Sequence, residues 1–213
     1  MCVLLNDYLF NSCLSIKGHC GVYRVKLKED DNSPVTSSNI ELITIDMMRP
    51  NGIGFRGDDL VVSECCQGTH LDGCKSGTSR WMVFNKQEQD VSKDGSAATS
   101  WIHSETIEDM VTADNGVGGC ADGFVVYEYV NSQAVKKAVL LASCFGGLCI
   151  VDLEAGDVVS RMWTARDDDG CRVSNIAIGK EYAFLTGSCG ILTLPLVSQP
   201  FESGTKSSLH TEF

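Results

Sequence analysis

Short apolar segments separated by turn sequences are the feature that most constrains the fold of this chain. Turn sequences such as Arg56-Gly57-Asp58-Asp59 and Glu154-Ala155-Gly156-Asp157 recur between them. Many short strands joined by turns rich in glycine, aspartate and asparagine predict an all-β fold. The strands are expected at 3–10, 21–27, 40–46, 52–55, 59–64, 80–85, 123–130, 137–144, 148–153, 157–163, 173–179, 182–187 and 190–196. The polar stretch 86–119 is ambiguous, and Ser104–Met110 is open to one helical turn.

Several of these segments are apolar at consecutive positions, as in Ala138–Ser143 and Leu148–Asp152. Strands that are buried on both faces have this pattern. One unit, a glycine followed by an apolar strand, occurs at residues 20–25, 146–152 and 189–196, and residues 79–84 fit as a fourth copy. Sheets stacked face to face, as in β-propeller blades, meet both conditions. An ordinary β-sandwich is the alternative.

Composition limits the partners and the location. The 213 residues are 43% hydrophobic, which is enough for a sizeable core. The net charge of −11 argues against nucleic acid and anionic membranes as main partners. No apolar stretch reaches the roughly 18 residues that a membrane span needs, and the amino-terminal segment lacks the pattern of a signal peptide. We therefore expect a cytoplasmic protein.

The 11 cysteines are unusual for a chain of this length. Without a secretory signal we expect most of them to be reduced and buried, with Cys149 and Cys189 serving as packing residues. Neither the cluster Cys65–Cys74 nor the pair Cys144 and Cys149 has the CxxC…CxxC spacing of a structural zinc site. The role of the Cys65–Cys74 insertion stays open.

Two short motifs place an oxygen-bearing side chain before a glycine at the entry to an apolar strand. These are Asn51-Gly52 and Asp122-Gly123. If each strand is the first of a propeller blade, the two side chains point toward a common axis. Amide and carboxylate oxygens are ligands for hard cations such as Ca²⁺ and Mg²⁺. The same dipeptides are also common hairpin turns, so spacing alone leaves both interpretations open.

An ordered set of motifs resembles the gluconolactonase and regucalcin-like lactonase family. The matching segments run collinearly over about residues 8–197: 21–25, 49–55 followed by 58–64, 80–84, 119–124, 146–152, 174–179 followed by 182–186, and 190–196. Each segment alone is weakly specific. Seven segments in one order are a much stronger indication.

The resemblance implies a six-bladed β-propeller with one divalent cation in its central channel. Enzymes of the family hydrolyse lactones of sugar acids or related esters. Asn51 matches the metal-binding asparagine, and Asp122 matches the aspartate that is both metal ligand and catalytic base. Calcium is the first expectation for the cation, with zinc, magnesium or manganese as alternatives. Asn175 belongs to a further motif of the family, and we expect a structural turn role for it.

The chain also departs from the family. No first blade with its metal-binding glutamate is recognisable, and Ser12 stands where an aspartate often occurs. The strands suffice for about four blades, so we expect residues 1–197 to be a partial propeller and residues 198–213 a polar tail. The predicted function is a metal-dependent hydrolase of lactones or esters, or a truncated relative of one. The alternatives are a non-catalytic propeller that binds a metal or a protein partner, and an inactive domain.

Overall fold

The computed structural model describes residues 2–5, 8–11, 21–26, 40–44, 47, 50–65, 79–88, 99–109, 121–131, 133–144, 147–163 and 173–196. Within these ranges the chain forms strands and turns only, which confirms the all-β prediction. No helix in the described ranges is long and apolar enough to cross a membrane. The predicted tail 198–213 lies outside the described residues.

The strands form four antiparallel sheets, and within each sheet the strands are hydrogen-bonded in chain order. The first sheet contains β1 (Cys2–Leu5), β2 (Tyr8–Asn11), β3 (Val22–Lys26) and β4 (Ile40–Thr44). The second contains β5 (Pro50–Arg56), β6 (Asp59–Cys65), β7 (Ser79–Glu88) and β8 (Thr99–Asp109). The third contains β9 (Phe124–Val130), β10 (Lys136–Cys144), β11 (Gly147–Asp152) and β12 (Asp157–Trp163). The fourth contains β13 (Val173–Ile178), β14 (Tyr182–Gly187) and β15 (Gly190–Pro195).

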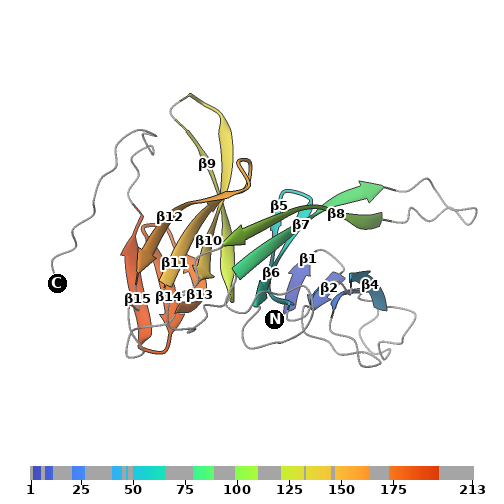
Figure 1. Ribbon diagram of the computed structural model, residues 1–213, viewed down its shortest axis with the longest axis horizontal. Helices are drawn as coiled ribbons and strands as arrows, with labels where there is room; N and C mark the ends of the chain where they lie inside the picture. The colour runs from blue at the N-terminus through green and yellow to red at the C-terminus, as the bar shows by residue number, and fades with distance from the viewer. Residues whose placement is uncertain are drawn as a thin grey trace, which may run out of the picture.

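The sheets follow one another across the molecule, and the first strands of successive sheets are in contact (Figure 1). Strand β1 contacts β5, β5 contacts β9, and β9 contacts β13. The four predicted copies of one repeated strand are β3, β7, β11 and β15, and each is the third strand of its sheet. The repeat seen in the sequence is therefore a structural repeat of one antiparallel unit.

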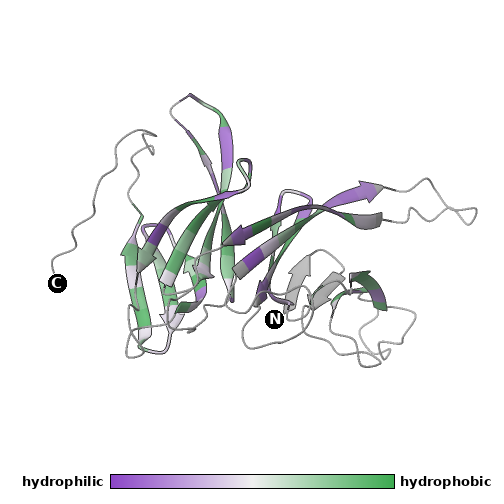
Figure 2. Ribbon diagram, in the orientation of Figure 1, coloured by the Kyte–Doolittle hydropathy of each residue, from purple (hydrophilic) through white to green (hydrophobic). Residues whose placement is uncertain are grey.

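Three apolar cores lie between neighbouring sheets. In the third sheet the two inner strands, β10 and β11, are largely apolar, whereas β9 and β12 carry hydrophilic stretches (Figure 2). Consecutive residues of one strand serve different cores. Val61 lies in the core shared by the second and third sheets, whereas Val62 lies in the core shared with the first. Leu140 and Leu141 divide in the same way between the second and fourth sheets. Burial on both faces explains why these strands lack the alternation of a half-exposed sheet.

Two predicted elements were wrong. Residues 3–10 were expected to form one strand, but they span parts of two strands, β1 and β2, paired as a hairpin in which Leu5 lies opposite Tyr8. The segment 104–110 was open to a helical turn, but residues 99–109 form β8, which pairs with β7 along its whole length. Pairing with a central strand overrides the weak local preference of this polar segment.

The expectation of reduced cysteines is wrong for the described cysteine side chains, those of Cys144, Cys149 and Cys189. Cys144 and Cys149 form a disulfide with a Cα–Cα distance of 6.0 Å, and Cys189 is disulfide-bonded as well. The first of these bonds closes the end of the β10–β11 hairpin, where Cys144 lies opposite Gly147. The Cys144–Cys149 bond therefore crosslinks two paired strands, and these cysteines do not act only as packing residues.

Candidate functional site

Asn51 and Asp122, the two residues selected from their motifs, lie where the first strand of the second sheet meets the first strand of the third sheet. Asn51 is the second residue of β5, and Asp122 lies two residues before the start of β9, with Gly123 between them. The two strands belong to different sheets and contact each other. The side chains of Asn51 and Asp122 are joined by a hydrogen bond. The structure therefore brings together two residues that are 71 positions apart in the sequence.

A bulge at the start of β5 shapes this corner. Pro50 lies opposite Glu64 and Ile53 opposite Val62, so the pairing register shifts across Asn51 and Gly52. A bulge removes residues from the regular ladder and redirects their side chains. The Gly52 amide, which the shifted ladder does not pair, donates instead to Ser63 Oγ at 2.6 Å.

Serine hydroxyls hold the main chain of Asp122 from both sides. Ser63 Oγ donates to the Asp122 carbonyl at 2.6 Å, and the Asp122 amide donates to Ser143 Oγ at 3.0 Å. Ser63 comes from β6 and Ser143 from β10, and both are 0% exposed. The bridge from Gly52 through Ser63 to Asp122 connects the second sheet to the third.

Two glycines make this close approach possible. A Cβ on Gly52 would lie 2.6 Å from the Asp122 carbonyl oxygen and 2.7 Å from Ser63 Oγ. A Cβ on Gly123 would lie 2.7 Å from the Ser174 carbonyl oxygen. The Gly123 amide donates to that same carbonyl at 2.7 Å, which ties the start of β9 to β13. Any other residue at either position would force the first strands apart.

The Asp122 carboxyl group is half-buried, and its electrostatics follow from that position. Burial raises the pKa of Asp122 above its ordinary value, and the hydrogen bond with Asn51 opposes this increase only in part. No ion pair with a described lysine or arginine side chain involves Asp122. Besides the Asn51 amide group, the positive charge of the amino terminus also favours the ionised carboxylate and lowers the pKa of Asp122.

A second acidic residue lies nearby on β6. Glu64 is 0% exposed and lies opposite Pro50, the residue before Asn51. Its carboxylate forms an ion pair with Arg80, which lies opposite it on β7. The guanidinium group compensates the buried charge, as a buried carboxylate requires. Glu64 thus supports this end of β6 structurally.

Asn175 occupies the corresponding place on β13. Its side chain lies beside the Cα of Gly123, and its Oδ1 accepts a hydrogen bond from the Ile176 amide at 2.9 Å. This local bond fits the structural role expected for Asn175, although the residue lies within a strand and not in a turn. The starts of β5, β9 and β13 therefore all carry an oxygen-bearing side chain.

The site offers oxygen donors of two kinds, an amide oxygen from Asn51 and a carboxylate from Asp122. This chemistry suits a hard cation such as Ca²⁺. Among the described residues no group of three or more histidine, cysteine, aspartate or glutamate side chains could hold a metal ion. Ser12 has no described side chain, and residues 66–74 lie outside the described ranges.

Sequence reasoning missed Ser63 and Ser143. The sequence offers only a weak signal, in that Val62-Ser63 and Ala142-Ser143 each end the apolar run of the second strand of a sheet. Comparisons with known protein families, curated proteins and solved structures find no match for this chain.

Proposed function

We propose that the chain is a metal-dependent hydrolase of sugar-acid lactones or related esters, built on propeller blades. The observation that carries this proposal is the hydrogen-bonded pair of Asn51 and Asp122 at the adjoining starts of β5 and β9. The pair was selected from motifs that resemble those of the lactonase family, and the two residues meet in space.

The arrangement of the sheets supports the propeller as the finer description of the fold. Each sheet is an antiparallel meander, and the first strands of successive sheets touch. In a propeller the first strands line the central channel. Asn51 and Asp122 would then face that channel from neighbouring blades.

The residues present fit the roles of cation ligand and base. Asn51 would provide its amide oxygen, and Asp122 one carboxylate oxygen, to a divalent cation, with calcium as the first choice. When bound, such a cation polarises the lactone carbonyl and stabilises developing negative charge. The Asp122 carboxylate would orient the attacking water and accept its proton. A pKa raised by burial suits this role, because it makes the carboxylate a stronger base.

The proposal is tested with the purified protein and a panel of sugar-acid lactones. We expect hydrolysis that chelator abolishes and that calcium restores, and we expect Asp122→Asn to remove it. Turnover that is insensitive to chelator would contradict the mechanism. Asp59→Asn provides the control, since it removes a carboxylate at the turn of the β5–β6 hairpin, the end of β5 that is farther from Asn51.

A non-catalytic cation-binding protein is the second candidate. It is favoured by the small number of oxygen donors that the described residues bring to the site, because two side chains alone give a weak calcium site. Calcium binding without hydrolysis of any lactone in the panel would support this candidate over the first.

The predicted cytoplasmic location remains a prediction. The Cys144–Cys149 disulfide weighs against it, because persistent disulfides are typical of oxidising compartments. Alkylation of free thiols in fresh extract, followed by mass spectrometry of the peptide containing Cys144 and Cys149, distinguishes a cytoplasmic location from an oxidising compartment. A fully alkylated pair would support the cytoplasm.

A further inference from the structure

Ser63 lies at the centre of the contact between the second and third sheets. Its hydroxyl accepts from the Gly52 amide and donates to the Asp122 carbonyl, both at 2.6 Å. An amide can only donate and a carbonyl can only accept, so the direction of the hydroxyl proton is fixed. A hydroxyl has one proton to donate, and Ser63 uses it on Asp122.

Ser63 connects one candidate ligand, Asp122, to Gly52, the residue that follows the other candidate ligand, Asn51. Gly52 follows Asn51 directly, and the bond to Asp122 is to its own carbonyl. Ser63 therefore sets how far the main chain at Asn51 stands from the main chain at Asp122. The close packing around Gly52 leaves this separation little freedom, since an added Cβ would meet both Ser63 and Asp122 at less than 3 Å.

Ser143 completes the arrangement from the other side. Its Oγ accepts from the Asp122 amide at 3.0 Å, and its own amide donates to the Gly123 carbonyl at 3.0 Å. The carbonyl and the amide of Asp122 are thus each held by a buried hydroxyl from a different sheet. With its main chain fixed, the Asp122 side chain keeps the orientation in which it meets Asn51.

We propose that Ser63 and Ser143 are positioning residues, which fix the spacing and orientation of Asn51 and Asp122 and so make the pair competent to hold a divalent cation. This inference rests on the proposed function and adds the residues that support the ligands. Outer residues that orient metal ligands typically change metal affinity by about 10–100-fold when they are removed.

The test compares Ser63→Ala, Ser63→Thr and Val61→Ala in the full chain. Val61 lies on the same face of β6, is 0% exposed and packs in the core between the second and third sheets, so its truncation weakens that contact without removing a hydroxyl. Calcium affinity is measured by calorimetric titration with calcium chloride. We expect Ser63→Ala to weaken binding by about tenfold or more. We expect Ser63→Thr to restore most of the affinity and Val61→Ala to leave it unchanged.

Hydrogen exchange of the Gly52 amide in the metal-free protein provides a second readout. We expect faster exchange at Gly52 in Ser63→Ala, but not in Ser63→Thr. If the wild-type chain binds no calcium, the proposed function fails, and the exchange result still reports whether Ser63 holds the strand. If the wild type binds calcium and Ser63→Ala binds it as tightly as Val61→Ala does, the positioning role is overturned.

Discussion

The β5–β6 hairpin has a carboxyl group near each of its ends, and the two groups have opposite environments. At the turn, Asp59 is paired with Arg56 at 2.9 Å and hydrogen-bonded to Asn85. Burial acts to raise the pKa of Asp59, but these hydrogen bonds and the charge of Arg56 outweigh it, and the pKa lies below its ordinary value. At the open end, burial raises the pKa of Asp122, and an asparagine is its side-chain partner.

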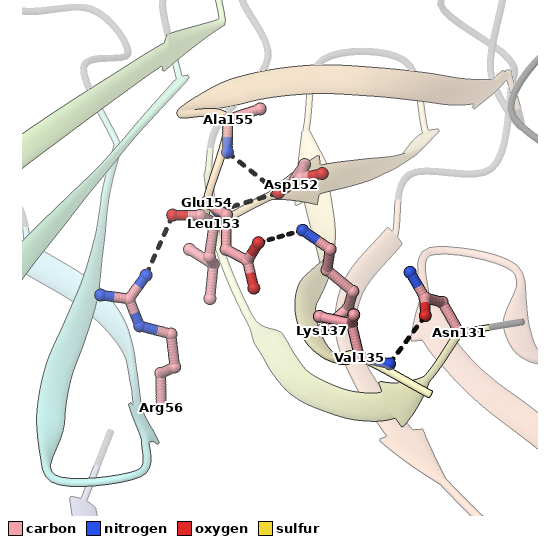
Figure 3. Close-up of polar contacts among 8 residues, drawn as sticks. All are labelled: Arg56, Asn131, Val135, Lys137, Asp152, Leu153, Glu154 and Ala155. Carbon is pink, nitrogen blue, oxygen red and sulfur yellow. Dashed lines mark hydrogen bonds and ion pairs between the residues drawn. The ribbon is translucent and has the colours of Figure 1, made fainter. Parts of the chain in front are cut away.

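The difference separates a structural carboxylate from a candidate functional one. Arg56, which compensates Asp59, also donates to the Leu153 carbonyl at 2.9 Å and so joins the second sheet to the third (Figure 3). Around that contact the β11–β12 turn is held by Asp152, which accepts from the amides of Glu154 and Ala155 (Figure 3). These polar contacts hold the β11–β12 turn and join it to the second sheet. At the other end, the Asp122 carboxylate is hydrogen-bonded to Asn51 and is the proposed ligand of a cation.

Calcium affinity gives the largest expected contrast. Asp122→Ala should weaken calcium binding by more than about 100-fold, because the loss of a direct carboxylate ligand exceeds the effect of removing a supporting residue. Asp59→Ala should leave the affinity unchanged. Calorimetric titration of both variants measures the difference. Equal effects of the two substitutions would remove the distinction between the two carboxylates.

Gly52, near the open end of the β5–β6 hairpin, and Gly57, in its turn, should both be sensitive to substitution, but for different physical reasons. Gly52→Ala should cost about 1–3 kcal/mol of unfolding free energy through overpacking. Gly57 has a φ of +57° and open space around it, so Gly57→Ala should cost about 1 kcal/mol through backbone strain. Urea denaturation measures both.

A matched pair of asparagine variants separates steric from conformational causes. Asn tolerates a positive φ, so Gly57→Asn should recover most of the stability that Gly57→Ala loses. Gly52→Asn should be at least as damaging as Gly52→Ala. Recovery at both positions would show that Gly52 is not closely packed against Asp122.

Removal of the Arg56 side chain, which pairs with Asp59, should lower the unfolding free energy by less than the steric clash of Gly52→Ala can. Arg56→Met should cost about 1 kcal/mol, because the pair with Asp59 is partly exposed and the bond to Leu153 is also lost. Calcium affinity should not change. A loss of calcium binding in this variant would mean that the two ends of β5 are coupled.

The dependence of stability on pH should have opposite signs at the two groups. The folded-state pKa of Asp59 is lowered, so its contribution is present above the unfolded-state pKa and is lost as the pH falls. The folded-state pKa of Asp122 is raised, so stability is lost as the pH rises through the interval between the unfolded and folded values. Asp59→Asn should therefore be destabilising at neutral pH, and Asp122→Asn stabilising. Thermal unfolding of both variants between about pH 3 and pH 7 checks the signs, an interval that contains the ordinary aspartate range.

The strands of this protein could be predicted well because burial on both faces leaves long apolar runs with turn residues between them. The four copies of the third strand were found in this way. Strand β8 escaped because its residues are polar and its place is decided by pairing with β7. The disulfide at Cys144 escaped because the cysteines were expected to be reduced in the absence of a recognisable secretory signal.

In the candidate site, too, some residues could be predicted from local sequence and others could not. Asn51 and Asp122 were identified from motifs, since a side-chain oxygen before a glycine at a strand entry is a local signal. Ser63 and Ser143 were not, because a serine that ends an apolar run gains its meaning only from the sheet packed against it. Their hydrogen bonds to Gly52 and Asp122 are visible only in three dimensions.

The central claim is that Asn51 and Asp122 together hold a divalent cation. A crystal structure of the protein soaked with calcium chloride, with anomalous difference density, tests it most directly. The account predicts one peak within about 2.3–2.6 Å of Asn51 Oδ1 and an Asp122 carboxylate oxygen, the usual calcium–oxygen distance. A well-ordered Asn51–Asp122 pair that keeps its mutual hydrogen bond at saturating calcium, with no peak beside it, would contradict the account.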